Sequence, residues 1–246
     1  MPGDSIHKNT IEVCFTPNLF DNILTKEPFI VVLTDILRAT TSICTAIANG
    51  VEAILPVATL EEARKLKEQG YLVASEQDGK KVDFADFGNS SFSFTRENVG
   101  GKTLVYCTTN GTRALDIARS AEIIVIGSFI NLNAVKNWVL SQHKNVVILC
   151  SGWKNKFCLE DCLYAGALAE GLSAAGTFCP ACDSSEAAMD LWKLAKNDVL
   201  GYIEKAAHRH RLKKLGLDDV IPYSFTLDLT DVVPVFDGKL IKNFYI

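Results

Sequence analysis

The segment Phe29-Ile-Val-Val-Leu-Thr34 runs directly into Asp35-Ile-Leu-Arg-Ala-Thr-Thr41, and this junction decides the fold. A short, continuous apolar run is typical of a strand that is covered on both faces. Apolar side chains then recur at helical spacing from Thr40 to Ala48, and the pair Asn49-Gly50 signals the end of a helix. The junction therefore predicts a buried strand that passes through a polar loop into a helix.

The same alternation of strand and helix patterns continues through most of the chain. Strands that alternate with helices imply a largely parallel sheet with helices on both faces. We therefore predict an α/β fold with three layers, α/β/α, around a largely parallel or mixed sheet. No linker divides residues 1–246, so we expect a single domain and leave a division into two lobes open. The patterns predict further strands at 53–57, 71–75, 103–107, 122–126, 145–150, 221–227 and 232–236, and further helices at 60–69, 112–120, 131–142, 159–174 and 184–215.

Residues 77–101 interrupt this rhythm. They are rich in glycine, aspartate, asparagine, serine and phenylalanine, and they show no sustained period. We therefore predict a long loop excursion here. Loops of this length inside a compact domain are often functional, so the excursion is a candidate part of the site.

The composition limits the partners of the chain. With 48% hydrophobic and 22% charged residues, it is typical of a globular domain with a substantial core. A net charge of −4 argues against a nucleic-acid partner, which would need a broad basic face. No segment reaches about 18 consecutive apolar residues, so we expect no membrane span. A homodimer is left open.

The cysteines and the start of the chain bear on the compartment. The first residues lack the apolar stretch of a secretory signal. Most of the eight cysteines lie inside apolar runs, among them Cys14, Cys44 and Cys150, and buried thiols explain them better than disulfides do. We therefore expect a cytoplasmic protein.

Three loops that join a predicted strand to a predicted helix carry polar residues. They cover residues 35–41, 108–113 and 151–161. α/β proteins bind ligands at the carboxyl ends of sheet strands, and a helix N-terminus offers free N–H groups to an anion. Because arginines and hydroxyls occur beside carboxylates, the loops predict a site for a small phosphorylated substrate and a divalent cation.

The first loop combines Asp35, Arg38 and Thr40. A carboxylate at a strand end can hold Mg²⁺, which binds carboxylates, waters and substrate phosphate through oxygen. An arginine can clamp a phosphate or a carboxylate with two parallel hydrogen bonds. The structural alternative is that Asp35 caps the strand, Arg38 is its surface partner, and Thr40 is an N-cap.

The second loop offers Asn110, Gly111, Thr112 and Arg113. Hydroxyls, an amide and a flexible glycine are suited to a backbone cradle for an anion. A threonine N-cap and an Asn-Gly turn would explain the same residues without a ligand. The recurrence of threonines with an arginine in both loops favours the functional interpretation.

Cys107 and Arg113 have the Cys-x5-Arg spacing of cysteine phosphatases, between a strand and a helix. A thiolate at a helix N-terminus would have a lowered pKa and could attack phosphorus. The residue before it is Tyr106, where that chemistry would place a histidine. We keep a Cys107 nucleophile as an alternative mechanism.

The third loop places Lys156 before Glu160 and Asp161, the first acidic residues of the next helix. Acidic residues suit a helix N-terminus without any further role. In the functional interpretation, one carboxylate binds metal or acts as a base, and the lysine neutralises the substrate. Glu76 ends another strand and is a further candidate metal ligand.

Other motifs are interpreted as structural. Cys179 and Cys182 have the spacing of a metal knuckle, but no second pair completes a four-ligand site. His208 and His210 lie among arginines and lysines on a predicted helix, and we interpret them as a solvated face. The chain has neither a P-loop nor a Gly-x-Gly-x-x-Gly fingerprint, so these routes to nucleotide binding lack support.

Five stretches in fixed order, spread over about half of the chain, carry a more specific signal: Asp35-Ile-Leu-Arg-Ala-Thr-Thr41, Asp86-Phe-Gly-Asn-Ser90, Thr108-Thr-Asn-Gly-Thr-Arg-Ala-Leu115, Ile126-Gly-Ser-Phe129 and Leu159-Glu-Asp-Cys-Leu-Tyr-Ala-Gly166. With them the sequence resembles the 2-phosphosulfolactate phosphatase family, the Mg²⁺-dependent enzymes of coenzyme M biosynthesis. The resemblance implies an α/β/α fold of the family's own type. It also implies hydrolysis of (2R)-2-phospho-3-sulfolactate to 3-sulfolactate and phosphate.

The resemblance places seven residues of the three loops in the site: Asp35, Arg38, Asn110, Thr112, Arg113, Glu160 and Asp161. From their chemistry we hypothesise the following roles. Glu160 or Asp161 would be the base that activates water, or Asp35 would itself accept the phosphoryl group. The family usually has threonine or serine where this chain has Cys107, which weighs against a thiol nucleophile. The expected metal ligands are Asp35, Glu76 and Glu160. The expected substrate-binding residues are Arg38, Thr40, Asn110, Gly111, Thr112, Arg113 and Lys156.

The sequence thus leaves three functions in view. The first is a Mg²⁺-dependent phosphatase that acts on a small, multiply anionic acid. The second is a cysteine phosphatase that uses Cys107 and Arg113. The third is a protein that binds anionic metabolites without turnover.

Overall fold

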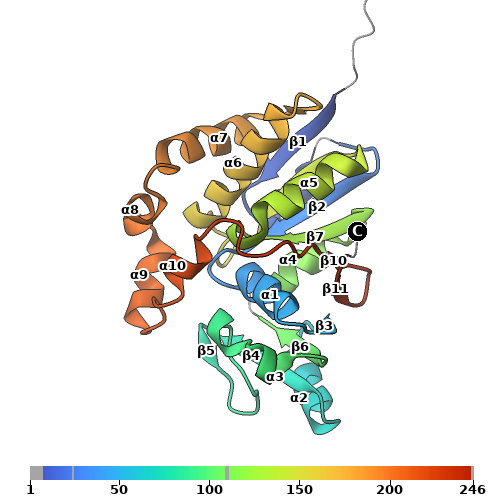
Figure 1. Cartoon of the computed structure of the whole chain (residues 1–246), viewed down its shortest axis with the longest axis vertical. Helices are drawn as coiled ribbons and strands as arrows, with labels where there is room; N and C mark the ends of the chain where they lie inside the picture. The colour runs from blue at the N-terminus through green and yellow to red at the C-terminus, as the bar shows by residue number, and fades with distance from the viewer. Residues whose placement is uncertain (1–7, 24, 109–110, 245–246) are drawn as a thin grey trace, which may run out of the picture.

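The computed structural model describes residues 8–23, 25–108 and 111–244, and these form an α/β fold (Figure 1). Its strands are β1 (Asn9–Cys14), β2 (Phe29–Thr34), β3 (Ala53–Pro56), β4 (Leu72–Gln77), β5 (Lys80–Lys81), β6 (Thr103–Cys107), β7 (Ile123–Gly127), β8 (Asn145–Cys150), β9 (Phe178–Pro180), β10 (Pro234–Phe236) and β11 (Ile241–Asn243). Its α-helices are α1 (Ala39–Ala48), α2 (Leu60–Glu68), α3 (Arg96–Val99), α4 (Gly111–Ile117), α5 (Leu132–Gln142), α6 (Leu159–Ala174), α7 (Asp183–Ala195), α8 (Val199–Tyr202), α9 (Ala207–Lys214) and α10 (Ile221–Ser224).

Across the described residues, 11 strands form one mixed sheet in the order β5-β4-β6-β3-β11-β10-β7-β2-β8-β1-β9. Strands β7, β2, β8, β1 and β9 are parallel to one another, and so are β4, β6 and β3. The C-terminal hairpin β10–β11 joins these two parallel sets, because β10 pairs with β7 and β11 pairs with β3. These three antiparallel pairings in succession give the two sets opposite strand directions.

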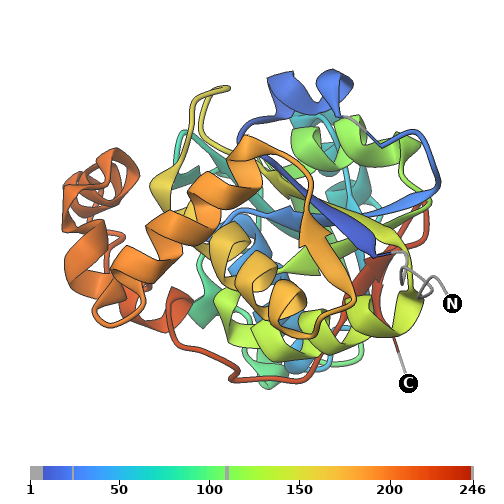
Figure 2. The same ribbon diagram turned by 90° about the horizontal axis from the view of Figure 1, so that it is seen from above.

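Alternate residues of β2 enter different cores, which confirms the predicted three layers. Ile30 and Val32 pack with residues of α5, α6 and α7 on one face of the sheet. Val31 and Leu33 pack with residues of α1 and α4 on the other face. Figure 2 shows α5, α6 and α7 together on one side. The uncharged run at residues 29–34 is therefore explained by burial on both faces.

A smaller core covers the outer part of the sheet. Ala63 of α2 packs against Val73 of β4 and Val105 of β6. The predicted excursion at 77–101 is mostly irregular, as expected, but it contains the short elements β5 and α3. None of the helices in the described ranges combines the length and the apolarity needed to span a bilayer.

The sequence misplaced several elements in the outer parts of the chain. The strand predicted at 221–227 is wrong, because residues 221–224 form α10, where Pro222 occupies the first helical turn that tolerates proline. The region predicted to be helical at 184–215 is helical in three pieces, α7, α8 and α9. Strands β1, β9 and β11 were not predicted. Their short sequences become strands only because long-range partners pair with them.

Glycine packing in α6 yields a test of the fold. A Cβ at Gly166 would overlap the carbonyl oxygen of Ala188 in α7, so Gly166→Ala should destabilise the protein by about 1–3 kcal/mol. The matched control is Gly171→Ala on the same helix, where the Cβ would meet only the flexible end of Lys136. This control should be neutral or slightly stabilising, since alanine favours helix. Urea unfolding of both variants measures the difference, and equal stabilities would contradict the close approach of α6 and α7.

Candidate active site

Asp161 ties the first and third predicted loops together. Its Oδ1 accepts a hydrogen bond from the backbone N–H of Ile36 at 2.9 Å, and its Oδ2 accepts one from the N–H of Gly152 at 3.0 Å. Asp161 lies in the first turn of α6, whose N-terminal N–H groups favour a negative charge. The sequence separation of 125 residues between Asp161 and Ile36 shows that this contact belongs to the tertiary structure.

Asp35 is held at the start of α1 by its own backbone and by Thr40. The N–H of Asp35 donates to Thr40 Oγ1 and the N–H of Thr40 donates to the Asp35 carbonyl, both at 3.0 Å. Asp35 Oδ1 accepts from the N–H of Ala39 at 3.3 Å. Thr40, predicted to bind substrate, is buried and fixes the loop that presents the Asp35 carboxylate.

A narrow cleft opens beside Asp35 and encloses about 390 Å³ of space between atoms, open solvent included. Acidic, basic and aromatic side chains from distant parts of the chain meet there. Its lining consists of Asp35, Leu37, Arg38, Glu76, Asp78, Gly79, Asn89, Thr108, Trp153, His208, Arg211 and Leu212. The first predicted loop, the excursion and α9 thus contribute to one cavity.

Three buried carboxylates gather behind and beside this cleft. Asp35, Glu160 and Asp161 are 8%, 1% and 2% exposed. Burial raises the pKa of Asp35 to about 6, although His208 partly offsets this, and the charges of Glu76 and Glu160 add to the rise. The pKa of Asp161 lies well above its ordinary value because of burial and then of Asp35 and Glu160. Such a cluster favours a bound cation.

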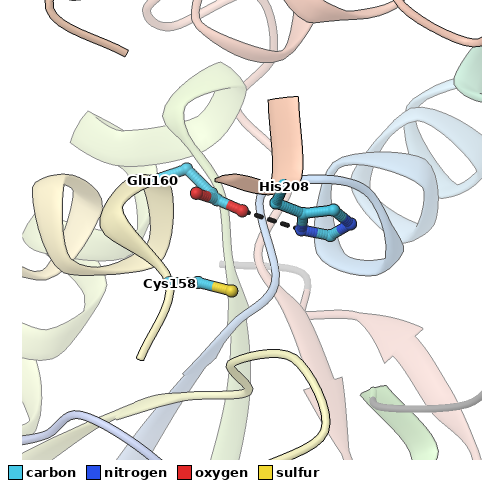
Figure 3. Close-up of side chains that lie close together, drawn as sticks. All are labelled: Cys158, Glu160 and His208. Atoms are coloured by element: carbon cyan, nitrogen blue, oxygen red, sulfur yellow. Dashed lines mark hydrogen bonds and ion pairs between the residues drawn. The ribbon is translucent and has the colours of Figure 1, made fainter. Parts of the chain in front are cut away.

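His208 was predicted to be solvated, and this prediction is wrong. Its side chain is only 10% exposed, and its Nδ1 lies 2.8 Å from Oε1 of Glu160 (Figure 3). The helix α9 folds back so that this residue meets the first turn of α6. His210, two positions later, is exposed as predicted. The three-residue spacing of His208 and Arg211, which places both on one face of a helix, was the local signal that this face could be buried against another element.

Two arginines face the cleft without a carboxylate partner. Arg38 is buried and donates from Nη2 to the Gly79 carbonyl at 3.3 Å, and burial lowers its pKa. The Arg211 guanidinium carbon lies 4.7 Å from the ring centre of Trp153, and its Nη1 is 3.5 Å from His208 Nε2. Within the described residues neither arginine forms an ion pair. The sequence did not point to Arg211 or Trp153.

Comparison with known proteins assigns the chain to a family. The family model described as 2-phosphosulpholactate phosphatase matches residues 14–239. This chain belongs to the 2-phosphosulfolactate phosphatase family. The family consists of phosphoric monoester hydrolases.

Several relatives carry the name "Probable 2-phosphosulfolactate phosphatase". The protein of Caldanaerobacter subterraneus subsp. tengcongensis is 36% identical over 87% of this chain and 90% of its own length. That of Gloeobacter violaceus is 38% identical over 91% of this chain and 94% of its own. That of Prochlorococcus marinus is 40% identical over 82% of this chain and 87% of its own length.

Four of the five stretches that resemble the family supply or support the cleft lining. Asp35, Asn89 and Thr108 line it from three of these stretches, and Tyr106 donates a hydrogen bond to Oδ1 of Asn89. The fourth stretch begins α6 and supplies Glu160 and Asp161 behind the lining. The remaining stretch, 126–129, lies outside the cleft lining and supports α1, because Ser128 Oγ lies 3.2 Å from Thr41 Oγ1.

The second predicted loop lines a wider, adjoining cleft. This cleft holds about 1120 Å³ of empty space, and it shares Glu76, Asp78 and Thr108 with the first. Thr112 and the exposed Arg113 line it. Asn110 lies outside the described residues.

Two other predicted substrate-binding residues have different positions. Gly111 lies where a Cβ would come within 2.9 Å of the Ala39 side chain, so glycine allows α4 to approach α1. Lys156 is exposed and lines neither cleft, whereas Lys154 lines the wider one and pairs with Asp78 at 3.2 Å.

Cys107 is poorly suited to nucleophilic attack. It is buried at the end of β6, and burial raises its pKa. A reactive cysteine needs the opposite, an environment that stabilises the thiolate. The Cys-x5-Arg spacing therefore reflects a strand end and a helix start without the electrostatics of a cysteine phosphatase.

The raised pKa of Asp35 predicts a pH-dependent gain in stability for Asp35→Asn. The folded-state pKa of about 6 exceeds the ordinary 3.8, so the fold favours the protonated form and ionisation destabilises it as pH rises through this window. In metal-free protein, Asp35→Asn should therefore be more stable than wild type at pH 8, by up to about 3 kcal/mol, with the difference vanishing below about pH 4. Urea unfolding across this range measures the effect.

The control for this test is Asp116→Asn, which removes an exposed carboxylate of α4. It should change stability little at any pH, since exposed ion pairs contribute weakly. A pH-independent difference for Asp35→Asn would show that the buried charge is not its cause.

Proposed function

We propose that this protein is a Mg²⁺-dependent phosphatase that hydrolyses (2R)-2-phospho-3-sulfolactate to 3-sulfolactate and phosphate. The observation that carries the proposal is the cleft itself, where Arg38 and Arg211, which form no ion pair with any described residue, lie beside the buried Asp35. Membership of the 2-phosphosulfolactate phosphatase family supports the same activity.

The arginines fit a substrate with several negative charges. Phosphosulfolactate carries a phosphate, a carboxylate and a sulfonate on three carbons, and such groups are bound by guanidinium donors. We assign Arg38 and Arg211 to these groups, with Trp153 holding the Arg211 guanidinium in place. Arg113 and Lys154 line the adjoining cleft and would attract the substrate electrostatically.

The carboxylates fit a hard divalent cation. Asp35 and Glu76 line the cleft and would hold Mg²⁺, which binds proteins through one or two carboxylates and keeps several waters. When bound, the ion supplies positive charge to the phosphoryl oxygens. Both carboxylate oxygens of Asp161 accept hydrogen bonds from backbone N–H groups. We therefore assign Asp161 to the positioning of the two loops, in place of the base role expected from the sequence. Glu160 lies behind His208 and outside the cleft lining.

Phosphate release from phosphosulfolactate by the purified protein tests the proposed function. We expect turnover that EDTA abolishes and Mg²⁺ restores, because the buried carboxylates require a cation to bind the phosphoryl group. Turnover that persists in EDTA would contradict the metal-dependent mechanism. Saturable binding without phosphate release would favour the non-catalytic alternative, and loss of activity in Cys107→Ala would favour the thiol mechanism.

Arg211→Gln should raise the KM for phosphosulfolactate about tenfold or more, since a hydrogen bond to a charged group contributes about 1.5–3 kcal/mol. Hydrolysis of phenyl phosphate, which lacks the carboxylate and the sulfonate, should change much less. The matched control is Arg209→Gln on the same helix, because Arg209 pairs with Glu204 and does not line the cleft. Equal effects on both substrates would contradict a role in recognising the additional anionic groups.

A further inference from the structure

Cys158, Glu160 and His208 bring three different metal-binding atoms together. Cys158 is the residue before the first turn of α6, Glu160 belongs to that turn, and His208 comes from α9. The thiol sulfur, a carboxylate oxygen and an imidazole nitrogen all lie within 4.8 Å of one another. Figure 3 shows the Glu160 carboxylate and the Cys158 sulfur near the same imidazole ring.

The surroundings of this group favour a cation. Cys158 and Glu160 are 6% and 1% exposed, and Glu160 Oε2 has no hydrogen-bond partner among the described residues. A buried carboxylate oxygen without a hydrogen-bond partner lowers the stability of the folded protein, because the oxygen has lost its hydration.

The ligand types select a different ion from Mg²⁺. Mg²⁺ prefers hard oxygen ligands, whereas thiolate and imidazole favour Zn²⁺ and chemically similar cations. A set of one cysteine, one carboxylate and one histidine leaves a fourth position open, as zinc sites with three protein ligands do. His208 also lines the cleft, so the group lies at its wall.

We propose that Cys158 Sγ, the Glu160 carboxylate and His208 Nδ1 form a binding site for a thiophilic divalent cation of the Zn²⁺ class. The site is distinct from the Asp35 and Glu76 carboxylates assigned to Mg²⁺, and it goes beyond the phosphatase activity. On binding, the metal–sulfur bond replaces the Cys158 S–H bond and the proton passes to solvent. His208 Nδ1 must carry no proton to bind the ion, so its hydrogen bond to Glu160 is lost on binding; a proton held on Nδ1 passes to solvent, and Nε2 keeps its contact with Arg211.

Titration of the metal-free, full-length protein with Co²⁺ tests this site without measuring catalysis. Co²⁺ reports thiolate ligation by a charge-transfer absorption in the near ultraviolet. We expect this band to saturate at one equivalent, to disappear on addition of Zn²⁺, and to persist in excess Mg²⁺. A band that excess Mg²⁺ removes, or Co²⁺ binding without any band, would overturn the proposal.

Two pairs of variants locate the ligands. Cys158→Ser should abolish the band, whereas Cys162→Ser, one turn further along α6, should keep it. His208→Ala should weaken Co²⁺ binding about tenfold or more, while His210→Ala, on the same helix but exposed, should leave it unchanged. Circular dichroism verifies the fold of each variant, and the histidine pair decides the question if Cys158→Ser does not fold. A band retained in Cys158→Ser, or unaltered affinity in His208→Ala, would refute the site.

Discussion

The pair of hydrogen bonds that the Asp161 carboxylate accepts from Ile36 and Gly152 is the contact on which the site depends. It joins the loops that follow β2 and β8, two neighbouring parallel strands, to the first turn of α6. Each loop would otherwise carry a buried, unsatisfied N–H group, which proteins rarely tolerate. Because the first loop is fixed in this way, Asp35 and Arg38 are presented to the cleft from a rigid support.

The buried acids and the arginines around the cleft do not pair with one another among the described residues, although pairing would stabilise the fold. Asp35, Glu160 and Asp161 are buried in or behind the cleft, and Arg38 and Arg211 line it, yet the described residues contain no ion pair between these acids and these arginines. Direct pairing would satisfy the charges and close the cavity. The absence of such pairs leaves the Asp35 carboxylate able to hold a cation and the two arginines able to bind anions, as the proposed metal-assisted phosphatase requires.

The topology explains how such distant residues meet. The hairpin β10–β11 couples two parallel sets of opposite direction, and the cleft draws residues from the ends of β2 in one set and of β4 and β6 in the other. Helix α9 contributes to the same cleft, where Leu212 is buried and His208 reaches Glu160. The binding residues of α9 therefore depend on the assembly of the whole sheet.

The sequence by itself determined the three-layer α/β fold and the placement of Asp35, Arg38 and Glu160 at strand-to-helix junctions. Hydrophobic periodicity and helix-start residues are local properties, so they can be recognised in the sequence without knowledge of the tertiary structure. Only the tertiary structure decided that Thr40 and Asp161 position loops, that Lys156 stays in solvent, and that His208 is buried. The basic segment around His208 has the composition of a solvated helix, and its buried face exists because Glu160, 48 residues away, meets it. Contacts between residues so far apart in sequence leave no periodic signal, and they form only when the packed sheet brings α6 and α9 together.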